Sequence, residues 1–391
     1  MLKTAHISTT SSVKRLLKIW AQRYTIDLSP LTDKLNTASV YANLAAASSV
    51  ENRAITAAKL GDLLVEIRCQ MAELQTNFLY SYLPHIVNSR EAHQLSHHAS
   101  LIYKKLMKIY QQPFDAASLT EVPINAPIQT YVANLGLPAI DKLATELNPL
   151  LLEYQEQHIA SKDWRTLGFM TTLINFSNDF LLKKLTLPEQ VLIKPYFQFI
   201  EEQVALPWER VCAAAASYTL ASPEFILVEK MLPQADEIAQ IVYLKLVKSL
   251  PYHYSRRGAL EEPGVAHSCL RDLQMFQAYL WFCFLEKSQE PIEKELVDLC
   301  AMVLTGVKVK WEMIEVCNKI LCEEIHSHLT LEQQSLLQPY TDGLQQAFKN
   351  EQHRFQINRH DFQLSDEQQK RFQIRGPGSF FYPKKLIGIV D

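Results

Sequence analysis

Apolar residues recur at helical spacing along most of the chain. From residue 11 to residue 25 they return every three or four positions, and basic residues flank them. This period of about 3.6 residues is typical of an amphipathic helix. Similar patterns predict helices over residues 50–83 and 91–110, and helix after helix from residue 128 to residue 348. The patterns therefore predict an all-α fold, a multi-helix bundle or array.

Two segments in the second half of the chain are alike. Residues 185–196 read LTLPEQVLIKPY and residues 329–340 read LTLEQQSLLQPY, with seven identities in twelve positions. Both begin with the Thr-x-x-Glu/Gln capping box of a helix start. Convergence on this common motif explains the threonine, but it does not explain the shared Pro-Tyr pair. We favour an internal duplication, with related helical units around residues 163–203 and 307–347.

A proline-containing stretch divides the chain. Three prolines between residues 111 and 127 interrupt the helical pattern, which is typical of a linker. We therefore predict an N-terminal helical domain at residues 1–112 and a C-terminal helical domain at residues 126–349.

The pattern changes again after residue 349. Residues 350–391 contain short apolar-polar-apolar triplets, which suit extended segments better than a helix. We predict an extended C-terminal tail that lies either along the protein's own surface or along a partner. The triplets begin at three phenylalanines that would dock the tail: Phe355, Phe362 and Phe372.

Composition agrees with a folded helical protein and narrows its function. Hydrophobic residues make up 48% of the 391 residues, enough apolar material for a core. Only 10 residues are glycine, the residue that β-rich folds and phosphate-binding loops need in their tight turns. The formal net charge of −3 lacks the strong positive field of a nucleic-acid-binding protein. We therefore expect no nucleic-acid partner.

The cysteines and the first predicted helix indicate where in the cell the protein is expected. The 7 cysteines are odd in number and include no Cys-x-x-Cys pair, which indicates buried thiols in a reducing, cytoplasmic setting. No run reaches the roughly 18 apolar residues of a membrane span. Residues 11–25 are basic and contain no acidic residue, as in a transit peptide or a membrane-surface helix. The same pattern also suits a first helix packed on its own core.

The segment 251–267 is the strongest candidate for a binding site. It reads PYHYSRRGALEEPGVAH and contains two of the scarce glycines. Paired arginines lie ahead of a predicted helix start near His267, where free backbone N–H groups would favour an anion. In the alternative, the loop is solvated and its arginines pair with Glu261, Glu262 or Asp272. The candidate anion-binding residues, for a ligand or a partner, are His253, Arg256, Arg257, Gly258, His267 and Arg271.

Other chemical motifs are weak. His93 and His97 share a helix face, but a metal site needs at least one further ligand. Glu323 and His326 have the spacing of di-metal bundles, yet the position aligned with His326 in the other repeat is Leu182. Motifs of phosphate-binding loops, dinucleotide-binding folds, serine hydrolases and kinases are lacking. We predict no metal and no cofactor, and we expect the chain not to be an enzyme.

Three functional hypotheses follow. The leading one is a non-catalytic interaction protein (an adaptor, assembly factor or regulatory subunit) that binds a protein partner through its helical surface and tail. The first alternative is a helical enzyme or a binder of a small ligand or pigment, with its anion site around residues 251–271. The nearly all-apolar helix 276–284 would then line a pigment or lipid pocket, unless it is central core. The second alternative is a peripheral membrane protein held by residues 11–25.

Overall fold

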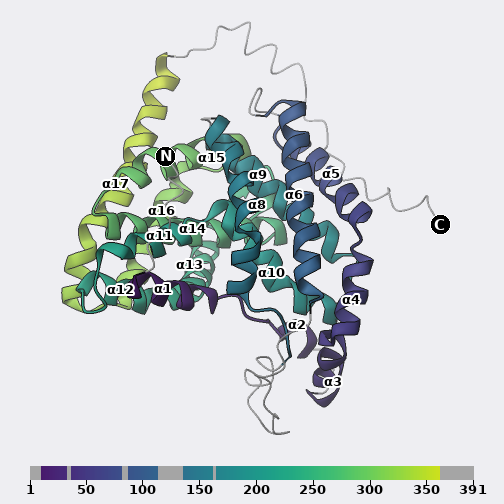
Figure 1. Ribbon diagram of the computed structural model, residues 1–391. Coiled ribbons are helices and arrows are strands. Elements are labelled where there is room, and N and C mark those ends of the chain that lie inside the picture. The colour runs from purple at the N-terminus through teal and green to yellow at the C-terminus, as the bar shows by residue number, and fades with distance from the viewer. Residues whose placement is uncertain (1–9, 33–36, 82–86, 113–134, 162–163, 362–391) are drawn as a thin grey trace, which may run out of the picture. The chain divides into compact units, whose positions relative to one another are not determined.

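The computed structural model describes residues 10–32, 37–81, 87–112, 135–161 and 164–361. Its contacts divide the chain into two compact units, Met1–Phe348 and Lys349–Asp391. The described residues are overwhelmingly helical, which confirms the predicted all-α class (Figure 1). None of the described helices combines the length and the apolar character that a bilayer span requires.

The helices up to residue 205 carry the labels of Figure 1. They are α1 (Ser11–Ala21), α2 (Ser29–Thr32), α3 (Thr37–Ser48), α4 (Val50–Lys59), α5 (Asp62–Leu79), α6 (Ser89–Tyr110), α8 (Ile140–Ser161), α9 (Trp164–Leu182) and α10 (Leu187–Ala205).

The later elements include one small hairpin. They are α11 (Trp208–Ala214), η2 (Ala215–Ser217), α12 (Pro223–Met231), η3 (Leu232–Gln234), α13 (Ala235–Ser249), β1 (Tyr254–Ser255), β2 (Gly258–Ala259), α14 (Pro263–Glu286), the π-helical η4 (Ile292–Leu296), α15 (Val297–Val307), α16 (Trp311–Ser327) and α17 (Leu331–Asp361).

The predicted helix over residues 50–83 is wrong in one respect. The structure contains two helices, α4 and α5, with a break at Leu60 and Gly61. Gly61 has extended backbone angles and caps the start of α5. The buried Leu60 keeps the apolar pattern continuous through the break, and both helices pack against α6. Periodicity alone therefore could not reveal the interruption.

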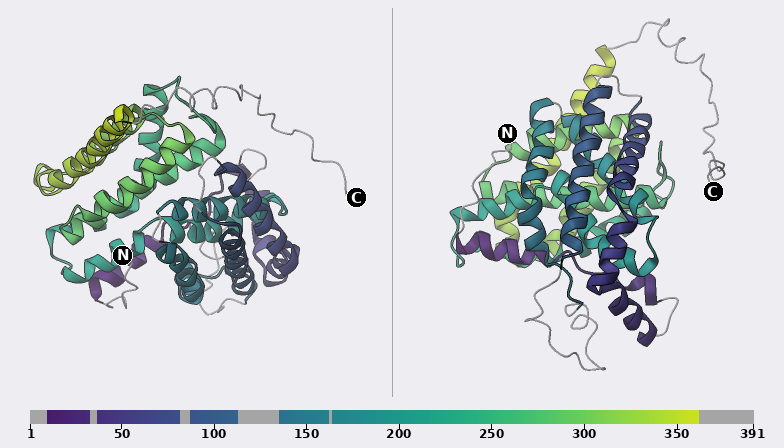
Figure 2. Two further views of the ribbon diagram at one scale, coloured as in Figure 1. Left: turned by 90° about the horizontal axis from the view of Figure 1, so that it is seen from above. Right: turned by 45° about the vertical axis from the view of Figure 1, so that its right-hand side comes forward.

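Two groups of helices build the core of the first unit. α5 packs against α6 and α9, while α10 packs against α8 and α9 (Figure 2). Beyond residue 206, α14 packs against α11, α12 and α13, and α13 also packs against α16. α14 lies at the centre of this second group, and seven of its residues from Ala278 to Leu285 are at most 3% exposed. This confirms that the apolar helix is central core.

The first helix packs on the protein's own core. Val13, Leu16 and Trp20 on α1 are at most 4% exposed, and α1 contacts α11, α12 and the short turns beside them. An apolar face that is already buried cannot also insert into a bilayer. The interpretation of residues 11–25 as a membrane-surface helix is therefore wrong for the folded protein.

The two repeated segments form the same kind of corner between helices. The Gln190 side chain donates to the carbonyl oxygens of Leu182 and Leu185, at 3.0 and 2.8 Å. Its counterpart Gln334 makes both aligned bonds, at 2.9 and 3.3 Å, to the end of the preceding helix. Each glutamine thus donates to the carbonyl of Leu182 or His326, which also accepts a backbone N–H, and to the carbonyl of the leucine that precedes the capping threonine. The shared corner supports the duplication, which stays a prediction.

We expect these corners to respond alike to mutation. Gln190→Ala and Gln334→Ala each remove two partly buried hydrogen bonds, so each should lower the free energy of unfolding by about 1–2 kcal/mol. Gln338→Ala removes only an exposed bond to Asp342 and should have little effect. Urea denaturation would measure all three. A loss of unfolding free energy at only one corner would mean that the aligned hydrogen bonds do not stabilise the two corners equally.

The predicted tail begins as a helix. α17 continues to Asp361, so Phe355 lies in a helix and the expectation of extended chain from residue 350 is wrong up to residue 361. The other two proposed docking residues, Phe362 and Phe372, lie outside the described residues.

Candidate functional site

A two-stranded hairpin leads into the central helix α14. Tyr254 pairs with Ala259 and Ser255 with Gly258, which leaves the two arginines at the turn. Gly258 has a φ of 121°, a conformation that residues with a side chain rarely adopt. α14 begins at Pro263 rather than near His267, so His267 lies one turn inside the helix instead of at its free N–H groups.

Gly258 offers a test of this turn. A Cβ atom there would lie 2.7 Å from Cγ of Glu262, and the substituted residue would have to adopt the positive φ of Gly258. Gly258→Ala should therefore lower the free energy of unfolding by about 1–2 kcal/mol. Gly264→Ala is the matched control, because its Cβ would meet only Arg257, at an ordinary 3.5 Å. Thermal unfolding should show no loss for the control, and equal losses would contradict the argument.

Two of the predicted site residues, His267 and Arg271, reach a helix of the first half of the chain, and a third, Arg257, binds α14 itself. His267 Nε2 lies 2.9 Å from Glu201 Oε1 on α10, and an Arg271 nitrogen lies 3.9 Å from the same oxygen. Arg257 reaches back from the hairpin and donates to Ser268 Oγ at 2.8 Å. It forms no ion pair with Glu261, Glu262 or Asp272 among the described residues.

The other predicted residues point elsewhere. Arg256 is exposed, and its backbone N–H donates to the Val307 carbonyl at 2.9 Å. His253 is half-buried, and its Nε2 atom has no hydrogen-bond partner among the described residues. Burial and the charge of Lys310 lower the pKa of His253. His253 therefore makes no hydrogen bond through Nε2 to Arg257, His267 or Arg271 among the described residues.

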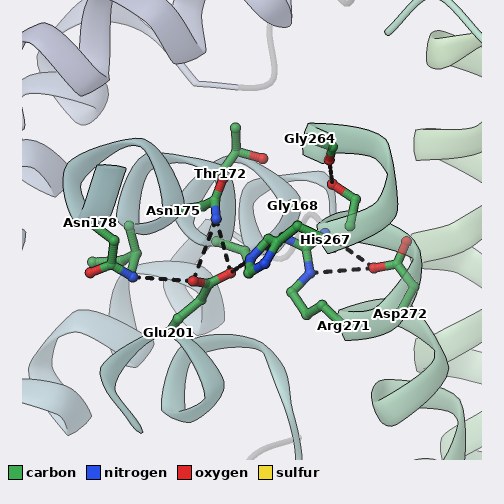
Figure 3. A network of polar contacts seen from close by, with 12 residues as sticks. Gly168, Thr172, Asn175, Asn178, Glu201, Gly264, His267, Arg271 and Asp272 are labelled. Carbon is green, nitrogen blue, oxygen red and sulfur yellow. Dashed lines mark hydrogen bonds and ion pairs between the residues drawn. The ribbon is translucent and has the colours of Figure 1, made fainter. Parts of the chain in front are cut away.

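Glu201 is the centre of the polar network that Figure 3 shows. Its side chain is 8% exposed, and Asn178 donates to Oε2 at 3.1 Å while Asn175 donates to Oε1 at 3.3 Å. His267 and Arg271 approach the carboxylate from the side of α14. The network thus joins α9 and α10 to the helix that follows the hairpin.

The charges of this network favour an ionised Glu201. Burial alone would raise the pKa of its carboxyl group, but the hydrogen bond and charge of His267 and the charge of Arg271 outweigh burial and lower it. Nearby Asp179 behaves in the opposite way, because burial raises its pKa and its neighbouring cations only partly compensate. Arg271 lies between two carboxylates, at 3.1 Å from Asp272 and 3.9 Å from the buried Glu201.

A thiol lies beside this network. Of the seven cysteines, six are buried, and only Cys269 is half-buried. Arg271, two positions after Cys269 on α14, donates to Asp272 Oδ1 at 3.1 Å. The Asp272 side chain is 42% exposed. Burial and the charge of Asp272 raise the pKa of the Cys269 thiol to about 12, although Arg271 and Arg257 lower it. Cys269, Arg271 and Asp272 thus lie within one turn of α14, with Cys269 and Asp272 on the same side of the helix.

Glu201 and Cys269 were not among the residues predicted from sequence. Glu201 is 66 residues from His267, and no local pattern marks it as their partner. Cys269 could have been singled out by the Cys-x-Arg-Asp stretch from residue 269 to residue 272. That stretch places three chemically distinct side chains within one helical turn.

Comparison with known proteins points to the same half of the chain. Residues 213–348, about a third of the sequence, match the model of a family described as Phycobilisome protein. No curated protein and no solved structure matches the chain. Phycobilisome proteins are non-catalytic light-harvesting components, in agreement with the prediction of a non-catalytic protein. The segment 213–348, which contains the hairpin, Cys269 and the central helix, is therefore similar to the globin-like phycobilisome proteins.

Proposed function

We propose that this chain is a non-catalytic phycobilisome component that binds a bilin pigment at the start of α14. The observation that carries the proposal is the position of Cys269, Arg271 and Asp272 inside the segment that matches the phycobilisome family. This function corresponds to the pigment-binding alternative derived from the sequence rather than to the adaptor hypothesis. Its protein partners would be other phycobilisome proteins, which assemble at the thylakoid membrane surface.

The residues at the start of α14 suit the chemistry of a bilin. Such a pigment is an open-chain tetrapyrrole with N–H donors, two propionate groups and an unsaturated side group, and it absorbs visible light when bound. The half-exposed Asp272 carboxylate can accept pyrrole N–H groups. Arg257, which has no carboxylate partner among the described residues, can pair with a propionate. The anion site predicted from the sequence would thus hold a pigment carboxylate.

Cys269 supplies a point of covalent attachment. Its sulfur would add to one carbon of the unsaturated side group while the thiol proton moves to the neighbouring carbon, so no oxidant or reductant is needed. The reactive form is the thiolate. Because the pKa of Cys269 is raised to about 12, little thiolate exists at neutral pH. We therefore expect attachment to speed up as the pH rises, or to need an attachment enzyme.

Coexpression with bilin-forming enzymes tests the proposal. The purified chain should be coloured, and the pigment should stay on the protein under denaturing conditions. Cys269→Ser should abolish this covalent pigment, whereas Cys322→Ser on α16 should retain it. Asp272→Asn should shift or weaken the visible band without unfolding the protein, since this side chain is partly exposed.

Two outcomes would contradict pigment binding at this site. One is a colourless protein that is folded by circular dichroism. The other is covalent pigment that survives Cys269→Ser, which would place the attachment at another residue. Either result would leave the family similarity of residues 213–348 intact and would favour a purely assembling role.

A further inference from the structure

The outer side of the hairpin exposes two tyrosines. Exposure alternates along residues 252–257, where Tyr252, Tyr254 and Arg256 are exposed and the residues between them are half-buried or buried. This period of two is that of a β-strand, whose side chains point to opposite sides in turn. Tyr252 is 96% exposed and Tyr254 is 70% exposed. Exposed tyrosines are typical of binding surfaces, because they bury much area at little cost in conformational entropy.

A turn with two lysines lies beside the hairpin. The backbone N–H of Arg256 donates to the Val307 carbonyl at 2.9 Å, which places the hairpin next to the end of α15. Lys308 and Lys310 follow in the turn after α15, and both are exposed. Neither lysine forms an ion pair among the described residues. The tyrosines and the lysines therefore lie on neighbouring segments, and we call residues 252–256 and 308–310 the hairpin surface.

Lys310 is placed against the local preferences of the helix that it precedes. It is the N-cap residue of α16, and its side chain makes no capping hydrogen bond. Serine, threonine, aspartate or asparagine is preferred at this position, and a cation there faces the positive end of the helix dipole. A residue that breaks a local rule without a gain in stability indicates a functional role. Lys310 is thus explained better by a binding partner than by the fold.

The charges of the hairpin surface favour an acidic partner. Arg256 has a contact of its own within the protein, so the available positive charge rests on Lys308 and Lys310. Glu312 is the acid closest to these lysines in sequence, and it is exposed in the first turn of α16. Two further exposed acids follow β2, on the strand opposite the tyrosines: Glu261 and Glu262. The segment from residue 308 to residue 310 is therefore the cationic part of this surface.

We propose that the hairpin surface binds an acidic, extended segment of a partner protein. Lys308 and Lys310 would pair with carboxylates of that segment, and the rings of Tyr252 and Tyr254 would cover its apolar residues. A narrow hairpin suits an extended segment better than a folded domain. Arg257, which would pair with the pigment, points to α14 instead, where it donates to Ser268. The interface is therefore independent of pigment binding.

Lys310→Ser separates binding from stability in the full-length chain. Serine caps α16 and removes the cation from the helix start, so the melting temperature should rise by about 1–3 °C. Affinity for a labelled peptide that repeats Glu-Leu-Gly should fall about fivefold or more, measured by fluorescence anisotropy at low salt. Lys14→Gln is the matched control, because Lys14 is exposed on α1 and forms no ion pair among the described residues. It should keep the wild-type affinity.

The double variant Tyr252→Ser/Tyr254→Ser tests the apolar part of the contact. It should weaken binding of the acidic peptide by about tenfold or more, because aromatic side chains contribute most to such interfaces. The melting temperature should not change, since both side chains are largely exposed. The control is Leu63→Ser/Leu244→Ser, which removes two apolar side chains that are 71% and 65% exposed elsewhere. A labelled peptide that repeats Lys-Leu-Gly should not bind the wild-type chain.

Cross-linking identifies what covers the surface. With a photoreactive benzoylphenylalanine in place of Tyr252, the acidic peptide should become linked at that position. Links between two chains, or to another part of the same chain, would assign the surface to a second copy or to the protein itself and would overturn the proposal. Peptide binding that survives both Lys310→Ser and the tyrosine variant would place the acidic site elsewhere. Loss of the peptide to phosphatidylserine vesicles that bind through the same residues would assign the surface to a membrane.

Discussion

Replacing Arg23 with alanine is expected to lower the free energy of unfolding by about 3–5 kcal/mol. The Arg23 side chain is 2% exposed, and its guanidinium lies 2.8 Å from Asp236 and 3.7 Å from Glu202. It also lies over the Trp208 ring, 4.8 Å from the centroid. Glu202 is almost fully buried, so removing Arg23 leaves that carboxylate without its counter-charge.

The same region contains a matched control. Arg15 pairs with Glu229 at 2.5 Å, but its side chain is 57% exposed. Arg15→Ala should therefore cost less than about 1 kcal/mol, because solvent screens such a pair. Guanidinium denaturation of both variants measures the difference in unfolding free energy, provided that the dependence of this free energy on denaturant concentration is the same for both. Equal losses at the two positions would show that burial of the Arg23 cluster does not determine its contribution.

The second large effect is expected at Glu201. Glu201→Gln keeps the shape of the side chain but removes the charge that faces His267 and Arg271. The free energy of unfolding at neutral pH should fall by about 2–4 kcal/mol. Glu323→Gln is the control, because Glu323 is 64% exposed and its nearest cation is 3.9 Å away. That control should be nearly neutral.

The effect of Glu201 should depend on pH in a defined direction. Its pKa in the folded protein is below the usual 4.5 of an unfolded chain, because the interactions with His267 and Arg271 outweigh the effect of burial. The stabilisation from ionised Glu201 is therefore complete above pH 4.5 and is lost as the pH falls through the folded value. The difference between wild type and Glu201→Gln should shrink over that range. A constant difference would mean that charge is not the cause.

Local sequence determined the helical class and several boundaries of this protein. The helix predicted over residues 91–110 begins at Ser89 and ends at Tyr110. Pro223 is the first residue of α12, a position where a proline costs no hydrogen bond because the N–H that it lacks would be unpaired there. These features could be predicted because caps and apolar periodicity act between residues within a few turns of one another.

The repeated corners were also readable from sequence. Thr330 and Gln333 exchange the two hydrogen bonds of a capping box, at 3.2 and 3.3 Å. Thr186 donates its backbone N–H to Glu189 at 2.8 Å. The role of the shared glutamines was not predicted, because their bonds reach back across the corner to the preceding helix. These bonds depend on how the chain turns between the two helices, and the pattern of apolar and polar residues does not specify that turn.

Only the tertiary structure decided which surfaces and charges are available. The pattern of residues 11–25 suited a membrane as well as a core, and packing of α1 placed its apolar face inside. The exposed apolar residues of α5, such as Leu63 and Leu74, could not be told apart from its buried ones, because periodicity counts apolar residues without locating their neighbours. Glu201 meets His267 only because α10 and α14 are brought together in the fold. The pKa values and the exposure of each side chain depend on burial and on long-range contacts. Burial and these contacts both arise from residues that are far apart in the chain.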